Sequence, residues 1–144
     1  MAPTHTASIA WCPTKHLTVS LGPQDAGAGS VFQPVVFTNK GPGSCRLRGY
    51  PGVLGVRSDG SAVTAKHSPG RVRTVTLVKG GKASALVHAS DVPVGGATAC
   101  PPDVVALKIT PPDNTVSVHA GVTLPSCGGL LVGAVVAGST PVPT

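Results

Sequence analysis

Apolar and polar residues alternate along several short segments of the chain, which is the pattern of half-buried β-strands. The alternation is clearest over residues 17–21, 105–110 and 116–121. Residues 31–38 are apolar in both phases, which predicts a strand at the centre of a sheet. Pro34 lies within that segment and lacks a backbone donor, so we expect a bulge there.

Weaker alternation and frequent turn residues predict the remaining strands, at residues 53–57, 62–65, 72–77, 83–89 and 130–136. Ser58-Asp59-Gly60-Ser61 and Lys79-Gly80-Gly81-Lys82 predict tight turns between neighbouring strands. About nine short strands at roughly ten-residue spacing are typical of a β-sandwich. We therefore predict an all-β fold, an immunoglobulin-like antiparallel β-sandwich of about seven to nine strands.

The composition supports this fold and indicates an aliphatic core. Aromatic residues make up 3% of the 144 residues, there is no glutamate, and the chain contains 19 glycines and 15 prolines. Such a chain favours strands and turns over helices. Its length suits a single β-sandwich domain, which we place at residues 12–137. We expect a flexible arm over residues 1–11 and a disordered Pro/Thr tail over residues 138–144.

Four cysteines in a short β-rich chain predict two disulfides and an oxidising compartment. Three pairings are possible, but residues equidistant from a hairpin turn face each other across the two strands. The midpoint between Cys100 and Cys127 falls at a predicted turn, residues 113–114. The midpoint between Cys12 and Cys45 falls at a loop tip, residues 28–29. We therefore predict the disulfides Cys12–Cys45 and Cys100–Cys127.

The first ten residues are polar and lack the apolar run of a signal peptide. We expect the sequence to be that of a mature protein, secreted or associated with the cell envelope, with Met1 added for expression. The apolar residues 130–137 are too few to span a bilayer, so we expect no transmembrane segment.

One stretch carries a family resemblance: Asn39-Lys40-Gly41, then Cys45-Arg46-Leu47-Arg48-Gly49-Tyr50-Pro51-Gly52-Val53. It resembles the central motif of an actinobacterial family, domain of unknown function 4232. Residues 75–81 are similar to the family's Leu-x-Pro-Gly-Gly turn, with Lys79 in place of the usual proline. The resemblance covers roughly residues 12–136 and implies export, but no established activity. Tyr50-Pro51 is a candidate cis peptide.

Patterns that indicate catalysis or metal binding are lacking. No Gly-x-Ser-x-Gly or Ser-x-x-Lys motif is present, and the five aspartates fall in predicted turns or loops. The five histidines have no His-x-His or His-x-x-x-His spacing, and disulfide-bonded cysteines offer no thiolate to copper. We predict a non-enzymatic protein with no cofactor and no metal site. The net charge of +6 comes from scattered basic residues without interleaved aromatics, so we expect no nucleic-acid partner.

We predict an exported module that binds an unknown envelope component, which is an anionic polymer, a lipid headgroup or a protein. The predicted contact surface is a loop with Arg46, Arg48 and Tyr50, because a disulfide and prolines hold its shape. The structural alternative is that Tyr50 fills the core while both arginines are simply solvated. The functional alternative is a small hydrolase or a ligand carrier with a site in an end pocket of the sandwich. A spacer domain without a ligand is a third possibility.

Overall fold

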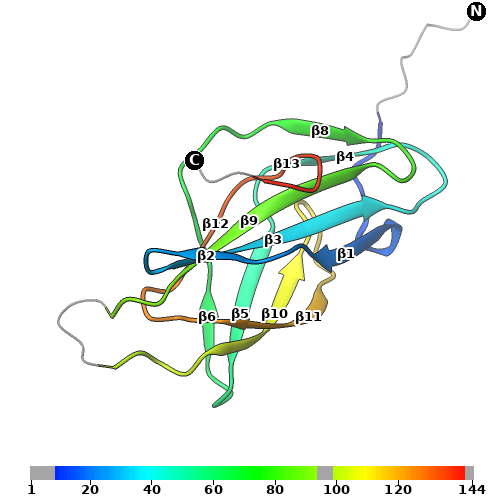
Figure 1. The fold of residues 1–144 in the computed structure, drawn as a ribbon. Helices are drawn as coiled ribbons and strands as arrows, with labels where there is room; N and C mark the ends of the chain where they lie inside the picture. Colours follow the sequence, from blue (N-terminus) through cyan, green and yellow to red (C-terminus); the bar gives the residue numbers. More distant parts are fainter. Residues whose placement is uncertain (1–8, 94–98, 142–144) are drawn as a thin grey trace, which may run out of the picture.

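The structure is a computed structural model that describes residues 9–93 and 99–141 (Figure 1). Within these ranges the chain is almost entirely β-structure, with one short 3-10 helix. The elements are η1 (Thr14–His16), β1 (Leu17–Leu21), β2 (Asp25–Gly27), β3 (Ser30–Asn39), β4 (Cys45–Arg48), β5 (Gly52–Arg57), β6 (Ala62–Thr64), β7 (Lys66–His67), β8 (Thr74–Leu77), β9 (Lys82–Ser90), β10 (Val104–Thr110), β11 (Val118–Leu124), β12 (Leu130–Val132) and β13 (Val136–Ala137). This described part contains no helix that is long and apolar enough to cross a membrane.

The strands form three sheets. The largest has the order β1-β3-β9-β12-β7, with β13 also paired to β9 and β2 to β3. The second has the order β11-β10-β5-β6, and β4 pairs with β8 in the third. In Figure 1 the second sheet lies below β3 and β9, while β4 and β8 lie above them. The protein is therefore an all-β fold with several sheets.

Alternation along β3 and β9 sets the two faces of the largest sheet. Residues at odd positions from Gln33 in β3 and Ala83 in β9 onward are almost completely buried, including Val35, Phe37, Ala85 and Val87. They pack in one cluster with Val104, Leu107 and Ile109 of β10. Even positions point to the opposite face. Because the chain has few aromatics, aliphatic side chains fill the space between the sheets.

Gly55 of β5 lies where the two larger sheets approach closely. A Cβ atom at this position would lie 2.9 Å from side-chain atoms of both Leu130 and Val104. Leu130 belongs to β12 of the largest sheet, so this contact joins the two layers. A side chain at Gly55 would force the layers apart, and glycine is therefore needed there.

The predicted strands are largely confirmed. Eight of the described strands have four or more residues, and five shorter ones, β2, β6, β7, β12 and β13, complete the sheets. Several segments differ from the prediction. β2 and β4 lie outside the predicted strands. Residues 66–67 also lie outside them but pair in parallel with β12, and the single strand expected over residues 130–136 is split into β12 and β13.

The bulge expected at Pro34 is absent, and the prediction was wrong there. The β3–β9 register runs without a shift from Ser30↔Ser90 to Thr38↔Lys82. Pro34 accepts a hydrogen bond from Gly22, just beyond the end of β1. The side-chain Nε2 of Gln33 donates to the carbonyl of Gly22 at 2.8 Å and so supplies the donor that proline lacks. A register shift does occur in β10, between Val104 and Ala106.

The last residues of the expected arm over residues 1–11 make backbone hydrogen bonds to β4. Arg46 N donates to Ala10 O, and Cys12 N donates to Arg46 O, each at 2.9 Å. These bonds make a parallel bridge between Trp11 and Arg46. The backbone before Cys12 is thus held by β4 from Ala10 onward, whereas residues 1–8 lie outside the described ranges. At the other end, Gly138 donates to Lys82 O, and residues 142–144 lie outside the described ranges.

Both predicted disulfides are formed, Cys12–Cys45 and Cys100–Cys127. The strand registers explain the success. β10 and β11 pair from Ile109↔Val118 to Val104↔Leu124 with one register shift, and the segments just beyond this outer end carry Cys100 and Cys127. In β1 and β3, Leu17 pairs with Asn39. The segment before β1, with Cys12, and the segment after β3, with Cys45, therefore lie at the same end of this strand pair. The disulfides indicate an oxidising environment.

Asn39 organises the turn of chain between β3 and β4. Its side chain is 1% exposed, and its Nδ2 donates to Gly43 O and to Leu77 O, each at 2.9 Å. Its Oδ1 accepts from Gly41 N at 2.9 Å. A Cβ at Gly41 would lie 2.9 Å from the ring of His16. The Asn-x-Gly part of the motif is thus a buried corner in which each residue has a structural task.

We predict that removing Cys12–Cys45 destabilises the protein more than removing Cys100–Cys127. The chain-entropy cost of each loss is about 3–4 kcal/mol. Cys12 and Cys45 are also buried, at 0% and 5% exposure, so their replacement by alanine additionally loses core packing. Urea unfolding of the two double-alanine variants measures the difference, and equal losses would contradict it.

We predict that Asn39→Ala lowers the free energy of unfolding by about 2–4 kcal/mol, because buried backbone partners lose their hydrogen bonds. Asn39→Asp keeps the shape and the acceptor but replaces the donor that serves Gly43 O and Leu77 O. We expect this variant to be destabilised as well. Chemical denaturation measures both, and a stability of Asn39→Asp equal to that of the parent would show that the amide donor is unimportant.

Candidate functional site

Arg46 and Arg48 do not lie in a loop, as the sequence predicted, but on strand β4. Alternation explains their placement, since Cys45 and Leu47 are buried in the core while the two arginines point to the other face. The pairing of Leu47 with Val75 on β8 extends this core face across the small sheet. The sequence did not predict this strand, because it has only four residues and is flanked by glycines and prolines.

The single tryptophan of the chain forms a stack with Arg46. The guanidinium carbon of Arg46 lies 4.3 Å from the centre of the Trp11 ring, which is a cation–π contact. Arg46 Nε is buried without a hydrogen-bond partner among the described residues. Trp11 itself is 40% exposed. The result is a large aromatic surface next to a positive charge.

Arg48 continues this face along β4. Its Nη1 donates to the hydroxyl of Thr74 at 3.1 Å, across the β4–β8 pair. Thr76 is the cross-strand neighbour of Arg46 in the β4–β8 register. Both cross-strand neighbours are neutral hydroxyl side chains. Arg48 is exposed, so its charge is available to a partner in solution.

Trp11 also lines a shallow hollow of about 460 Å³. The residues around it come from the start of the described chain and from the segment before β4. They are Ala10, Trp11, Pro13, Lys15, His16, Pro42, Gly43, Ser44 and Cys45. Lys15 is exposed and lines the same hollow as Trp11. We call Trp11, Lys15, Arg46 and Arg48 together the Trp11 surface.

Tyr50 is anchored by contacts of its own. Its ring stacks on His67 of β7, with 4.1 Å between the ring centres and 4° between the planes. Its hydroxyl donates to Ser68 O at 2.6 Å. The turn before it uses a positive φ of 96° at Gly49, which favours glycine. The Tyr50-Pro51 peptide is trans, because the described residues contain no cis bond.

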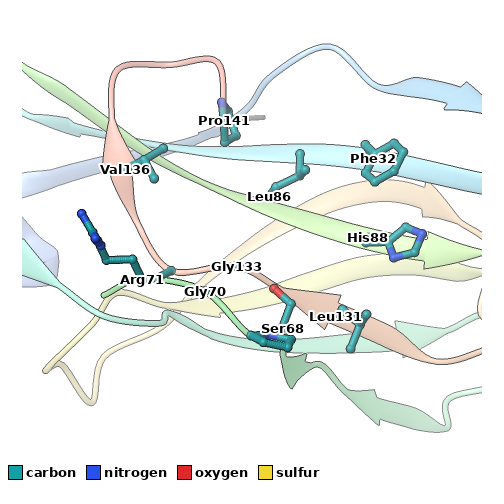
Figure 2. Close-up of a pocket in the computed structure, with 12 residues that line it drawn as sticks. Phe32, Ser68, Gly70, Arg71, Leu86, His88, Leu131, Gly133, Val136 and Pro141 are labelled. Carbon is teal, nitrogen blue, oxygen red and sulfur yellow. The ribbon is translucent and has the colours of Figure 1, made fainter. Parts of the chain in front are cut away.

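A second hollow, of about 490 Å³, lies on the outer face of the largest sheet (Figure 2). Even positions of β3 and β9 supply Phe32, Leu86 and His88. We call it the sheet groove. Its lining residues are Phe32, Ser68, Pro69, Gly70, Arg71, Leu86, His88, Leu131, Gly133, Ala134, Val136 and Pro141. The groove therefore lies on a face of the sheet. The carrier alternative considered from the sequence had its site in a pocket at one end of the sandwich.

The histidines offer little acid–base chemistry. His88 Nε2 lies 2.9 Å from the hydroxyl of Ser30, and its ring stacks on Phe32. A nucleophilic serine needs its histidine oriented by a third group, but the hydrogen bonds among the described residues join no histidine to a carboxylate. The same ranges contain no group of three side chains able to hold a metal ion.

Asp59 lies in the tight turn between β5 and β6. The Ser61 hydroxyl and backbone amide hydrogen-bond to its carboxylate and lower the pKa of Asp59. This turn forms where the sequence predicted it, with Gly60 at a positive φ of 87°. The shift is therefore a feature of the turn and does not mark a reactive group.

Comparison with known families places the chain. Residues 12–142 match the model of the domain of unknown function DUF4232, and the chain belongs to this family. Neither the comparison with curated proteins nor the comparison with solved structures found a match. The resemblance seen in the central motif is therefore confirmed, and it carries no activity with it.

Sequence reasoning missed Trp11, Lys15 and Arg71 as possible contact residues. A signal for Trp11 was present in the disulfide pairing. A disulfide between Cys12 and Cys45 brings the segments on which Trp11 and Arg46 lie next to each other. The structure thus brings Arg46 and Arg48 together on one face, while Tyr50 contacts a separate segment. No comparable signal pointed to Arg71, which lies in a loop.

We predict that Tyr50→Phe lowers the free energy of unfolding by about 1 kcal/mol, because it removes one hydrogen bond and keeps the stacked ring. Tyr50→Leu also removes the stack on His67 and is expected to cost more. Urea unfolding measures both. Identical stabilities of the two variants would show that the stack contributes nothing.

Proposed function

We propose that this protein is an exported, non-enzymatic module that binds an anionic polymer of the cell envelope through the Trp11 surface. The observation that carries the proposal is the stack of Arg46 on an exposed Trp11, with Arg48 beside it on β4. Arginine suits phosphate and carboxylate groups because its planar fork donates two parallel hydrogen bonds. An exposed aromatic ring adds a flat surface for a sugar or another apolar face of the polymer.

Rigidity of the backbone supports this assignment. The Cys12–Cys45 disulfide joins the two segments that carry Trp11 and Arg46, and two backbone hydrogen bonds hold them in register. The arginine stems are already ordered by Trp11 and Thr74. A surface that is ordered before binding loses less conformational entropy when a partner binds.

Charge favours an anionic partner. The chain carries a formal net charge of +6, and the Trp11 surface contains three cations. The hydrogen bond that Arg48 makes here goes to a neutral hydroxyl, so its charge is not neutralised by a neighbouring carboxylate. Two disulfides support a location outside the cytoplasm, and an envelope rich in anionic polymers supplies such partners there. A hydrolase is less well supported, since the one Ser–His pair described lacks an orienting carboxylate.

Binding to polygalacturonate, polyphosphate and neutral dextran tests the proposal, at low salt and at physiological salt. We expect the two anionic polymers to bind and dextran not to bind. Arg46→Ala/Arg48→Ala should weaken binding about tenfold, which corresponds to roughly 1.4 kcal/mol. Higher salt should weaken it further because it screens exposed charges. Calorimetry or affinity electrophoresis provides the measurement.

Lys82→Ala/Lys108→Ala is the matched control, because it also removes two positive charges, but at exposed positions on β9 and β10. We expect it to retain most of the affinity. Equal losses in the two double variants would mean that net charge alone causes binding and would overturn the proposed site. Thermal melts of both variants confirm folding before the comparison. Binding to anionic lipid vesicles but not to the polymers would overturn the choice of partner.

A further inference from the structure

The sheet groove is a second candidate site that does not depend on the proposed function. Alternation along the central strands creates its floor. Phe32, Leu86 and His88 occupy even positions of β3 and β9, on the face opposite the core. Leu131 is the outward residue of β12, between its buried neighbours, and is 36% exposed. The floor is thus a largely apolar strip along three adjacent strands.

One wall is the segment that follows β7, and the structure holds this wall firmly. Ser68 N donates to Val132 O at 2.9 Å, and Tyr50 donates to Ser68 O from the other side. Tyr50 also stacks on His67, the residue before the wall. Ser68, Pro69, Gly70 and Arg71 then line the groove. The tyrosine of the central motif is therefore a positioning residue for this wall.

The end of the described chain also lines the groove. Gly133 N donates to Leu86 O, and Val136 pairs with Ser84 of β9. After this strand the chain turns back so that Pro141 also lines the groove. In Figure 2, Arg71 and Val136 lie toward one end, Phe32 and His88 lie at the other, and Leu86 lies between them. The groove is therefore elongated, with unlike ends.

Charge is confined to one end. Arg71 is the one permanently charged side chain among the lining residues, and these residues include no carboxylate. At the other end, the rings of Phe32 and His88 are stacked at 4.8 Å, and His88 is tied to Ser30. A volume of about 490 Å³ lies within the roughly 300–1,000 Å³ typical of small-molecule sites.

We propose that the sheet groove binds a small amphiphilic carboxylate, with the anion at Arg71 and the apolar body along Leu86 toward Phe32. Charge complementarity selects the anion, since a single arginine fork matches one carboxylate. The apolar strip between the two ends selects an elongated hydrocarbon body. The groove runs along the sheet and has its charge at one end, so a bound molecule lies lengthwise along the sheet surface. The occupant is therefore a free monomeric carboxylate and not a lipid held in a bilayer.

Three probes with a ten-carbon chain test the proposal: decanoate and decyltrimethylammonium below their micelle concentrations, and decanol below its solubility limit. Titrations followed by calorimetry and by amide chemical shifts report affinity and location. We expect saturable decanoate binding with shifts at Phe32, Leu86 and the wall at residues 68–71. Decanol should bind more weakly, and the cationic probe should not bind at the groove.

Two variants separate charge at the groove from charge elsewhere. Arg71→Gln should weaken decanoate binding roughly fivefold to tenfold, because it removes one partly solvated ion pair. Arg73→Gln loses the same charge two residues away, outside the groove lining, and should bind as the parent does. Leu131→Gln should weaken decanoate and decanol alike, because it makes the floor polar. Amide spectra of each variant establish that it is folded.

Several results would overturn the proposal. Decanoate that does not saturate would exclude the site, and so would equal affinities of Arg71→Gln and Arg73→Gln. Tight binding of decyltrimethylammonium at the groove would exclude an anion site. Chemical-shift changes confined to the Trp11 surface would place the binding elsewhere. Loss of decanoate binding in Arg46→Ala/Arg48→Ala would likewise contradict an independent groove.

Discussion

The ladder between β3 and β9 runs over nine residue pairs without a register shift, and the other strands of the largest sheet pair with it directly or, for β7, through β12. β1 and β2 pair with one side of β3, while β12 and β13 pair with the far side of β9. The uniform register means that one parity of positions supplies the core and the other supplies the outer face. A bulge at Pro34 would have exchanged these faces. The side-chain Nε2 of Gln33 donates to Gly22 O, which Pro34 cannot reach with a backbone N–H. The uniform register is kept, and with it both the core face and the groove face of the sheet.

The central motif of the family divides into three structural parts. Asn39 and Gly41 form a buried corner, Cys45 and Leu47 anchor β4 to the core, and Tyr50 braces the segment after β7. None of these residues has to touch a ligand to account for its contacts. The same framework nevertheless shapes two surfaces. Cys45 fixes Arg46 against Trp11, and Tyr50 holds the wall that carries Arg71. Structure and candidate binding sites are therefore coupled through one stretch of chain.

Prediction from sequence succeeded where the evidence was local or followed from strand register. The disulfides could be paired because the two cysteines of each pair lie on either side of an antiparallel strand pair. Each pair is about equally far along the chain from the turn between those strands. Prediction failed where long-range pairing overrides local signals. β4 lies among glycines and prolines and exists because β8 and the Ala10–Cys12 segment pair with it. β7 has two residues, and only a parallel neighbour, β12, makes them a strand.

The amino-acid sequence by itself determined the strand content, the turns, the family and the two disulfides, since each rests on spacing or on residue type along the chain. Only the tertiary structure decided which side chains share a surface. Trp11 meets Arg46 from 35 positions away, and Tyr50 meets Ser68 from 18 positions away. Such contacts depend on how sheets pack and which strands become neighbours. Alternation tells which face a residue occupies, but it does not tell what lies across that face.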